Sequence, residues 1–521
     1  MRSALAALAL IAGAFLPAHA ADPVTLSVNP QGPLLSLDPV ARPDYATIDH
    51  GYMVYDTLFA LDDALVARPQ MVESHLVSAD GLEHAIGLRP GLRWHDGGEV
   101  TAEDCIASIR RWAQVDPFGR DLMARVKAIE PTGRTSFTIT LDRPFPLLPE
   151  ALARPLGTVP FMMPARLAAT PPGQAIDEAI GSGPFRLVQR SVGLYRTLYE
   201  KNTDYLPRAE PARLLAGGKH ALVDRVELLY MPDTATAVFY LNAGTLDYWD
   251  LMPAIAPAHV TRNPDVVVRA REPFGQLALL RLNHRVKPFD AVRLRRAAAL
   301  AIDRAAIVTA LAKLVNESWP CASAFACALP GGEAPRPDAR PAPDRREAAR
   351  RLVREAGYDG RPVLLLSASD QPEIEAVVQA VAMQLRLAGF VVRIESMPWQ
   401  DLARRRQSRI EPESGGWNGF VTRWPAIDLW SPGWNAALRG NGDAAWFGWP
   451  EDARIEQLRQ DWIDAPTAER RKALRADLER AASESVPYVP LVQFRLPRGH
   501  RTNVSEPPAA PAAIFWGIEK K

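Results

Sequence analysis

The segment that most constrains the fold is a strand–helix–strand unit in the second half of the chain. It runs through "PVLLLSAS" (362–369), "EIEAVVQAVAMQLRLAG" (373–389) and "FVVRIESM" (390–397). The middle stretch has the apolar spacing of an amphipathic helix that Gly389 terminates, and both flanking stretches have strand composition. Two strands joined through a helix are parallel. The unit therefore predicts an α/β fold, and it carries no G-x-G-x-x-G motif that would indicate a bound nucleotide.

The N-terminus has the layout of a secretory signal peptide. Arg2 precedes the apolar run "ALAALALIAGAFL", and "AHA" (18–20) supplies small residues around a cleavage point. The run is too short to span a bilayer, and no later stretch approaches the roughly 18 apolar residues that a transmembrane helix needs. We expect cleavage after residue 20 and a soluble mature protein, beginning near Ala21 or Asp22, in an export compartment.

Length and charge define the broad class. About 500 mature residues suggest roughly three domains, and 47% hydrophobic residues allow substantial cores. Lys and Arg number 61 against 60 Asp and Glu, a net charge of +1. A charge balance this even gives no sign of a nucleic-acid or membrane partner.

Three cysteines are too few for a metal framework. Cys321 and Cys327 flank "ASAFA", and an oxidising compartment allows them to form a small disulfide-closed loop; two free thiols are the alternative. Cys105 falls in the apolar rhythm of a helix, so we expect it to be a buried small hydrophobe.

The stretch "LRWHDGGEVTAEDCIASIRRW" (92–112) resembles a reaction centre at first sight, because five titratable residues lie close together. Each of them also has a structural explanation. Asp96 suits a Gly-Gly turn, Thr101 and Asp104 form a capping box, and acids in the first helical turn favour the helix dipole. We therefore interpret the stretch as structural; its titratable residues are His95, Asp96, Glu99, Glu103 and Asp104.

No motif in the chain requires catalysis. H-E-x-x-H, G-x-S-x-G and Walker motifs are absent, and the nine histidines are scattered. The sequence thus predicts a protein that is not an enzyme and holds no cofactor or metal. A secreted hydrolase remains the alternative, since the paired carboxylates of a glycosidase leave no local motif.

Tryptophan is concentrated in the C-terminal third. Eight of the thirteen tryptophans lie between Trp399 and Trp462, many within Gly-, Asn- and Pro-rich sequence. Aromatic residues on long loops suit contact with organic ligands. We expect about half of these indoles to pack beneath loops instead.

A collinear series of segments resembles the periplasmic solute-binding proteins of the oligopeptide/dipeptide type, family 5. The most specific is "LRPGLRWHDGGEVTAEDCIASIRR" (88–111), which resembles the family signature. The others follow in order along nearly the whole mature chain: "LSLDPV" (35–40), "GSGPFRL" (181–187), "YEKNTDYL" (199–206), "VDRVELLYMPDTATAVFYLNAGTLDY" (223–248) and "LRLNHRVKPFDAVRLRRAAALAIDR" (280–304).

The resemblance implies a two-lobed α/β periplasmic binding-protein fold, class II and cluster C in type. Lobe I would comprise 22–50, 178–274 and 485–521, with an inserted subdomain at 51–177, and lobe II would comprise 275–484. Such proteins are periplasmic, close around a peptide-like or other small organic solute, and deliver it to the membrane subunits of an ABC permease. We expect a monomer. Some relatives carry nickel or haem, a cargo that the scattered histidines support poorly.

In peptide-binding members, an aspartate in a Trp-rich loop of lobe II pairs with the ligand's amino group. The similar segment here is "WNGFVTRWPAIDLW" (417–430), where Arg423 stands near the expected position and Asp428 follows. Arg423 would favour an anionic ligand, or else would pair internally with Asp428 or Glu413. Asp428 is the alternative partner for a ligand ammonium.

Further contacts follow from the same resemblance. Trp417, Phe420 and Trp424 are the expected aromatic contacts in lobe II. For lobe I the expected contacts are Tyr45, Thr47, Trp249 and Asp250, each with a structural role equally open.

Overall fold

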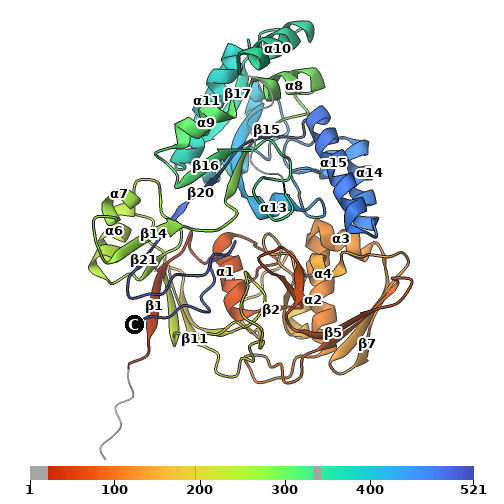
Figure 1. Ribbon diagram of the computed structural model, residues 1–521, viewed down its shortest axis with the longest axis vertical. Helices are drawn as coiled ribbons and strands as arrows, with labels where there is room; N and C mark the ends of the chain where they lie inside the picture. The colour runs from red at the N-terminus through yellow and green to blue at the C-terminus, as the bar shows by residue number, and fades with distance from the viewer. Residues whose placement is uncertain (1–21, 194, 333–341) are drawn as a thin grey trace, which may run out of the picture.

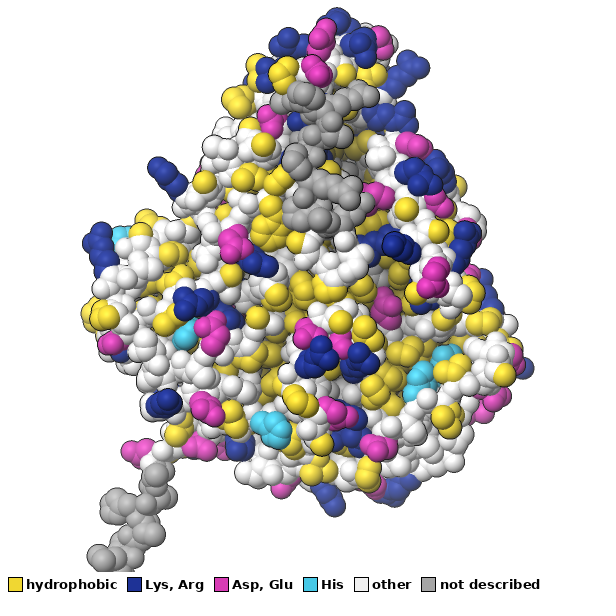
Figure 2. Space-filling view, in the orientation of Figure 1, with side chains coloured by type: hydrophobic (Ala, Val, Ile, Leu, Met, Phe, Trp, Pro, Cys, Tyr) yellow, Lys and Arg dark blue, Asp and Glu magenta, His cyan; other side chains and the backbone are white. Residues whose placement is uncertain are grey.

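The computed structural model describes residues 22–193, 195–332 and 342–521. The chain forms two lobes stacked along the long axis of the molecule (Figure 1). The predicted signal peptide, residues 1–20, lies outside the described residues. Basic and acidic side chains are interspersed over the face in Figure 2, as expected from the balanced composition.

A seven-stranded mixed sheet forms the core of lobe I. Strand β1 lies near its centre and pairs in parallel with β12 and β13, and the other pairings are antiparallel. Helix α1 (Tyr45–Val54) lies between this sheet and lobe II (Figure 1). In spatial order the strands are β10 (Phe185–Ser191), β11 (Arg196–Lys201), β12 (Arg225–Leu229), β1 (Thr25–Asn29), β13 (Tyr248–Trp249), β21 (Pro497–Arg501) and β14 (Val266–Ala270). The helices α6 (Thr234–Ala243) and α7 (Pro257–Val260) cover its β13–β14 end.

The segment expected as an insertion, 51–177, forms a separate sheet, which is antiparallel, together with its own helices. The spatial order of this sheet is β5 (Val72–Val77), β6 (Glu83–Leu88), β8 (Ser136–Leu141) and β7 (Val126–Gly133). Two short two-stranded sheets accompany it, β2 (Asp56–Thr57) with β9 (Phe161–Met162) and β3 (Phe59–Leu61) with β4 (Ala67–Pro69). The helices are α2 (Ala102–Val115), α3 (Pro117–Met123), α4 (Leu148–Ala151) and α5 (Ala165–Ala168).

Lobe II is built on a six-stranded mixed sheet. The predicted strand–helix–strand unit is confirmed as β17, α11 and β18, with the two strands parallel. In spatial order the strands are β16 (Glu317–Pro320), β20 (Val489–Arg495), β15 (Gln276–Leu282), β19 (Gly419–Pro425), β17 (Val363–Ala368) and β18 (Val392–Met397). The helices are α8 (Val292–Ala301), α9 (Arg304–Leu311), α10 (Ala342–Glu355), α11 (Pro372–Leu387), α12 (Trp399–Arg405), α13 (Ala426–Trp430), α14 (Ala453–Asp464) and α15 (Ala468–Ser485), and two short 3₁₀ turns span Pro412–Ser414 and Gly442–Ala444.

The chain crosses between the two main sheets twice. The first crossing lies between β14 and β15, close to the expected boundary at 274/275. The second differs from the expected boundary at 485, because β20 pairs with β15 and β16 of lobe II. Only β21, after Leu496, returns to the sheet of lobe I. Nearly all residues of β20 are buried, so the strand has no alternation of apolar and polar residues. Its sequence therefore does not reveal which sheet it joins.

No helix within the described ranges is long and apolar enough to cross a membrane.

Candidate solute-binding site between the lobes

Three segments that are distant in sequence meet where the lobes face each other. Helix α1 contributes Tyr45, the crossing segment contributes Arg271 and Glu272, and the β19–α13 segment contributes Arg423 and Asp428. All four charged groups act electrostatically on the Tyr45 phenol, whose pKa burial raises to about 12. Sequence similarity had suggested Tyr45, Arg423 and Asp428, whereas Arg271 and Glu272 were missed because no motif marks them.

Arg423 has internal partners. Its Nη1 donates a hydrogen bond of 2.8 Å to Oε1 of Gln276, and its Nε lies 3.2 Å from Oε1 of Glu373. The expected internal partners, Asp428 and Glu413, form neither contact. Glu373 lies in the first turn of α11, fifty residues before Arg423 in sequence, so only the packing of α11 against β19 brings them together. The positive charge of Arg423 is therefore balanced before any ligand arrives.

Asp428, by contrast, has no hydrogen bond or ion pair with any described residue. Its Oδ1 is fully buried. Burial raises the pKa of this carboxyl to about 6; the positive charge of Arg154 acts against the rise, and the negative charge of Asp116 adds to it. An ionised carboxylate in such a place lacks the partner that its desolvation requires.

Two residues of the crossing segment bear on buried acids: Arg271 pairs with Asp250, which follows β13, and Glu272 is itself an acid without a full set of partners. Asp250 is 3.0 Å from Nε of Arg271, and both side chains are almost fully buried. Asp250 also accepts hydrogen bonds from the Tyr248 hydroxyl at 2.8 Å and from Gln31 at 3.1 Å, so the structure gives it a full set of internal partners. Glu272, the next residue after Arg271, has a buried Oε2 without a partner in the described chain.

The aromatic residues of the Trp-rich loop divide into two groups. Trp417 and Phe420 are completely buried in the core of lobe II, whereas Trp424 is partly exposed and packs edge-on against Trp446 at 5.0 Å. Of the eight tryptophans between 399 and 462, four are buried and four are partly exposed. Of the three aromatic residues expected to contact a ligand from lobe II, only Trp424 is partly exposed.

The remaining expected contacts in lobe I are internal. Thr47 is buried, and its hydroxyl and backbone N–H both donate to Asp44, the N-cap of α1. Trp249 is 3% exposed and belongs to the apolar cluster beneath α6.

The segment at 92–112 is structural, as interpreted from the sequence. Thr101 and Asp104 form the predicted capping box at the start of α2. Asp104 also accepts hydrogen bonds from Trp94 Nε1 at 3.1 Å and from the Ala165 N–H at 2.6 Å. Burial lowers the pKa of His95 to about 4, and its Nε2 lies 3.1 Å from the Gly183 carbonyl oxygen. Asp104 thereby joins α2 to neighbouring segments, and His95 joins its turn to the segment at Gly183.

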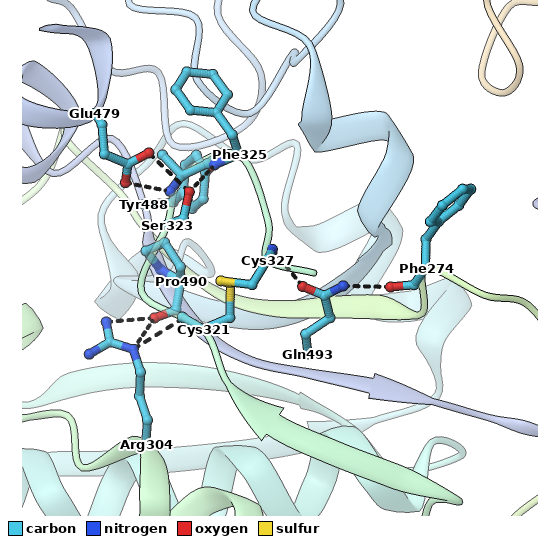
Figure 3. Close-up of a disulfide and its surroundings, with 11 residues drawn as sticks. Phe274, Arg304, Cys321, Ser323, Phe325, Cys327, Glu479, Tyr488, Pro490 and Gln493 are labelled. Atoms are coloured by element: carbon cyan, nitrogen blue, oxygen red, sulfur yellow. Dashed lines mark hydrogen bonds between the residues drawn. A yellow bond between two sulfur atoms is a disulfide. The ribbon is translucent and has the colours of Figure 1, made fainter. Parts of the chain in front are cut away.

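The cysteines of lobe II form a disulfide that closes a loop beside β20. Cys321 is bonded to Cys327, and the Cys327 N–H donates to Oε1 of Gln493 at 2.8 Å (Figure 3). Glu479 of α15 accepts from the Ser323 hydroxyl at 3.0 Å and thereby fixes the other side of the loop. Cys105 is buried and unpaired, as expected, and burial raises the pKa of its thiol.

Comparison with known proteins decides the family. The model of the bacterial extracellular solute-binding proteins, family 5, matches residues 67–450. The chain belongs to this family. A relative from Sinorhizobium fredii, "Probable peptide ABC transporter periplasmic-binding protein y4tO", is 34% identical over 93% of this chain and 91% of its own length. The glutathione-binding protein GsiB of Shigella dysenteriae is 25% identical over 97% of this chain and 95% of its own.

Solved structures give the same fold. The dipeptide binding protein of Pseudoalteromonas sp. SM9913 in complex with Met-Leu superposes with a TM-score of 0.76 at 16% identity, covering 95% of this chain and all of that one. The binding protein AgaA of A. tumefacien R10 in complex with agropinic acid gives 0.74 at 21% identity, covering 96% and 98%. This family 5 protein therefore has the two-lobed fold and serves an ABC importer as its solute-binding component; nothing favours the hydrolase alternative.

The family also includes structural neighbours that bind nickel complexed with histidine. Within the described ranges, no group of three or more His, Cys, Asp or Glu side chains could hold a metal ion.

Proposed function

We propose that this binding protein captures a peptide-like solute with a free ammonium group between its lobes and delivers it to an ABC permease. The observation that carries the proposal is Asp428, a carboxylate at the lobe junction whose Oδ1 is buried without a partner. A ligand ammonium would supply the missing positive charge and the missing hydrogen-bond donor. The resulting charge-assisted hydrogen bond is among the strongest that a protein can form. The relative named as a peptide transporter component supports the same solute class.

Arg423 takes the carboxylate end of the same zwitterionic solute in this proposal. Because Glu373 already balances its charge, Arg423 orients a carboxylate through its remaining N–H groups and does not select an anionic ligand by itself. Trp424 packs against the apolar part of the solute, and Tyr45 contacts it from lobe I.

The proposal includes the setting of the protein. The chain is exported through the signal peptide at 1–20, acts in the periplasm as a monomer, and releases its solute unchanged. Lobe I comprises 22–50, 178–274 and the chain after Leu496, with 51–177 inserted, and lobe II comprises 275–496. Delivery requires the permease to accept the closed, loaded form.

Isothermal titration calorimetry with di- and tripeptides tests the ammonium pairing. Asp428→Asn is expected to weaken binding of free peptides roughly 10- to 100-fold, since a hydrogen bond to a charged group contributes about 1.5–3 kcal/mol. The matched control Glu413→Gln changes an exposed acid of lobe II and is expected to bind as the wild type does.

N-acetylated peptides provide the opposing measurement, because they lack the ammonium. Equal affinity of the wild type for free and acetylated peptides would show the ammonium proposal to be wrong. Mass spectrometry of the recovered peptide checks for turnover, and a cleaved product would favour a hydrolase.

A further inference from the structure

Glu272 is a buried acid that the proposed peptide contacts leave unused. Its side chain is 3% exposed, and its Oε2 has no hydrogen-bond partner among the described residues. The other oxygen, Oε1, has only a contact of 3.5 Å with Nε2 of Gln276. Since a buried polar atom without a partner is uncommon in a folded protein, this oxygen requires an explanation.

Glu272 lies at the lobe junction. It lies in the segment where the chain crosses from lobe I to lobe II. Its carboxylate interacts electrostatically with Asp428 of lobe II and with Tyr45 of α1, both of which belong to the candidate site. Glu272 therefore lies on the side of the candidate site where the chain crosses between the lobes.

Charges near Glu272 leave an excess of acid. Arg271 is already paired with Asp250 at 3.0 Å. Asp49 of α1 is 1% exposed, accepts the Ala513 N–H through Oδ1 at 2.8 Å, and has no partner for Oδ2 within the described chain. Asp49, Asp250 and Glu272 thus all act electrostatically on the guanidinium of Arg271. Buried charge of one sign without compensation is costly, and a bound cation would relieve it.

We propose that Glu272 forms a second cation subsite, so that the solute carries a basic side chain or second amine in addition to the ammonium held by Asp428. This inference rests on the proposed function and narrows its substrate class to dicationic peptide-like solutes. Asp49 interacts electrostatically with Arg271 and adds negative potential. A neutral solute group at Glu272 would leave the acid excess in place.

Matched peptide pairs test the subsite. Lysine and norleucine have the same chain length apart from the ammonium, so dipeptides and tripeptides carrying one or the other at each position isolate the second charge. Calorimetry on the wild type is expected to give the best lysine peptide roughly 10- to 100-fold higher affinity than its norleucine partner. Glu272→Gln, which keeps the side-chain size, is expected to abolish that preference, read as the ratio of lysine to norleucine affinity within each protein.

The outcomes separate this inference from the proposed function. If lysine and norleucine peptides bind the wild type equally, or if the lysine preference survives in Glu272→Gln, the subsite is refuted while Asp428 stands. If Asp428→Asn has no effect but Glu272→Gln removes the lysine preference, the ammonium assignment fails and the subsite stands.

Native mass spectrometry of protein purified from its own periplasm provides a reading that does not depend on the peptide panel. A co-purifying solute with two basic groups supports the subsite even if no panel peptide binds. A solute with one basic group or none overturns it. Absence of both a co-purifying solute and any panel binding counts against the subsite and the peptide proposal together.

Discussion

Single residues at the lobe junction owe their properties to burial more than to residue type. Glu272, Asp428 and Asp49 are ordinary acids in sequence, yet each has a carboxylate oxygen that is buried without a partner among the described residues. Burial raises the pKa of Glu272 to about 7, with the positive charge of Arg271 opposing the rise. In the ligand-free protein these acids therefore hold protons at a pH where exposed acids have lost them.

The stability of the ligand-free protein should consequently depend on Glu272 and pH. Because the folded state binds the proton more tightly than the unfolded state, the contribution of Glu272 to stability falls as pH rises from its ordinary pKa of 4.5 through about 7. Between pH 5 and pH 8 the wild type is expected to lose on the order of 2 kcal/mol relative to Glu272→Gln. Urea unfolding of both proteins at the two pH values measures this difference, and parallel curves would contradict it.

At the scale of elements, Asp104 shows how a local signal acquires a tertiary role. The sequence places it in a capping box, and the structure adds hydrogen bonds from Trp94 and from the Ala165 N–H at the start of α5. The Asp104 carboxylate therefore accepts a hydrogen bond from the N-cap N–H of α2. It also holds two neighbouring segments through Trp94 and Ala165. Asp104 therefore ties the start of α2 to the rest of the subdomain.

Replacing the capping residues should give unequal losses of stability. Thr101→Ala is expected to cost about 1 kcal/mol, the usual value of an N-cap. Asp104→Ala is expected to cost about 3 kcal/mol, because it leaves several buried donors without an acceptor. Denaturant unfolding measures both changes, with Glu103→Ala, an exposed neighbour, as the control near zero. Similar losses for Thr101→Ala and Asp104→Ala would show that the tertiary contacts of Asp104 contribute little.

For the whole molecule, polar contacts away from the candidate site join the inserted subdomain to lobe II. Arg125, just after α3, is almost fully buried and lies 2.5 Å from Oδ1 of Asp464 at the end of α14. Its Nη2 also donates to Gln460 at 3.0 Å. Figure 1 shows α3 facing α14 across the boundary between the lobes. These contacts hold the lobes together on the side opposite the α6–α7 end of lobe I.

Loss of the Arg125 contacts is expected to weaken solute binding without altering the site. If closure is required for tight binding, Arg125→Met reduces the closed population and raises the apparent Kd roughly three- to tenfold. Arg143→Met is the matched control, because Arg143 is half exposed and lies 3.9 Å from the same carboxylate. Calorimetry gives the Kd values, and small-angle X-ray scattering should show a larger radius of gyration for ligand-free Arg125→Met. An unchanged Kd and radius would remove these contacts from the closing mechanism.

Local sequence patterns determined the elements and the family. The strand–helix–strand unit at 362–397, the capping box at Thr101 and the signature at 88–111 were readable because each depends on residues within a few positions of one another. The two-lobed fold followed from the collinear series of such segments.

Only the tertiary structure decided the charges of the site and the course of the last strands. Arg423 pairs with Glu373 rather than with a nearby acid, Glu272 became visible only through its burial, and β20 stays in lobe II. Ion-pair partners and desolvation depend on which distant segments pack together, and a fully buried strand carries no alternation to show which sheet it joins. The sequence therefore determined what the molecule is built from, and long-range packing determined which charges remain for a solute.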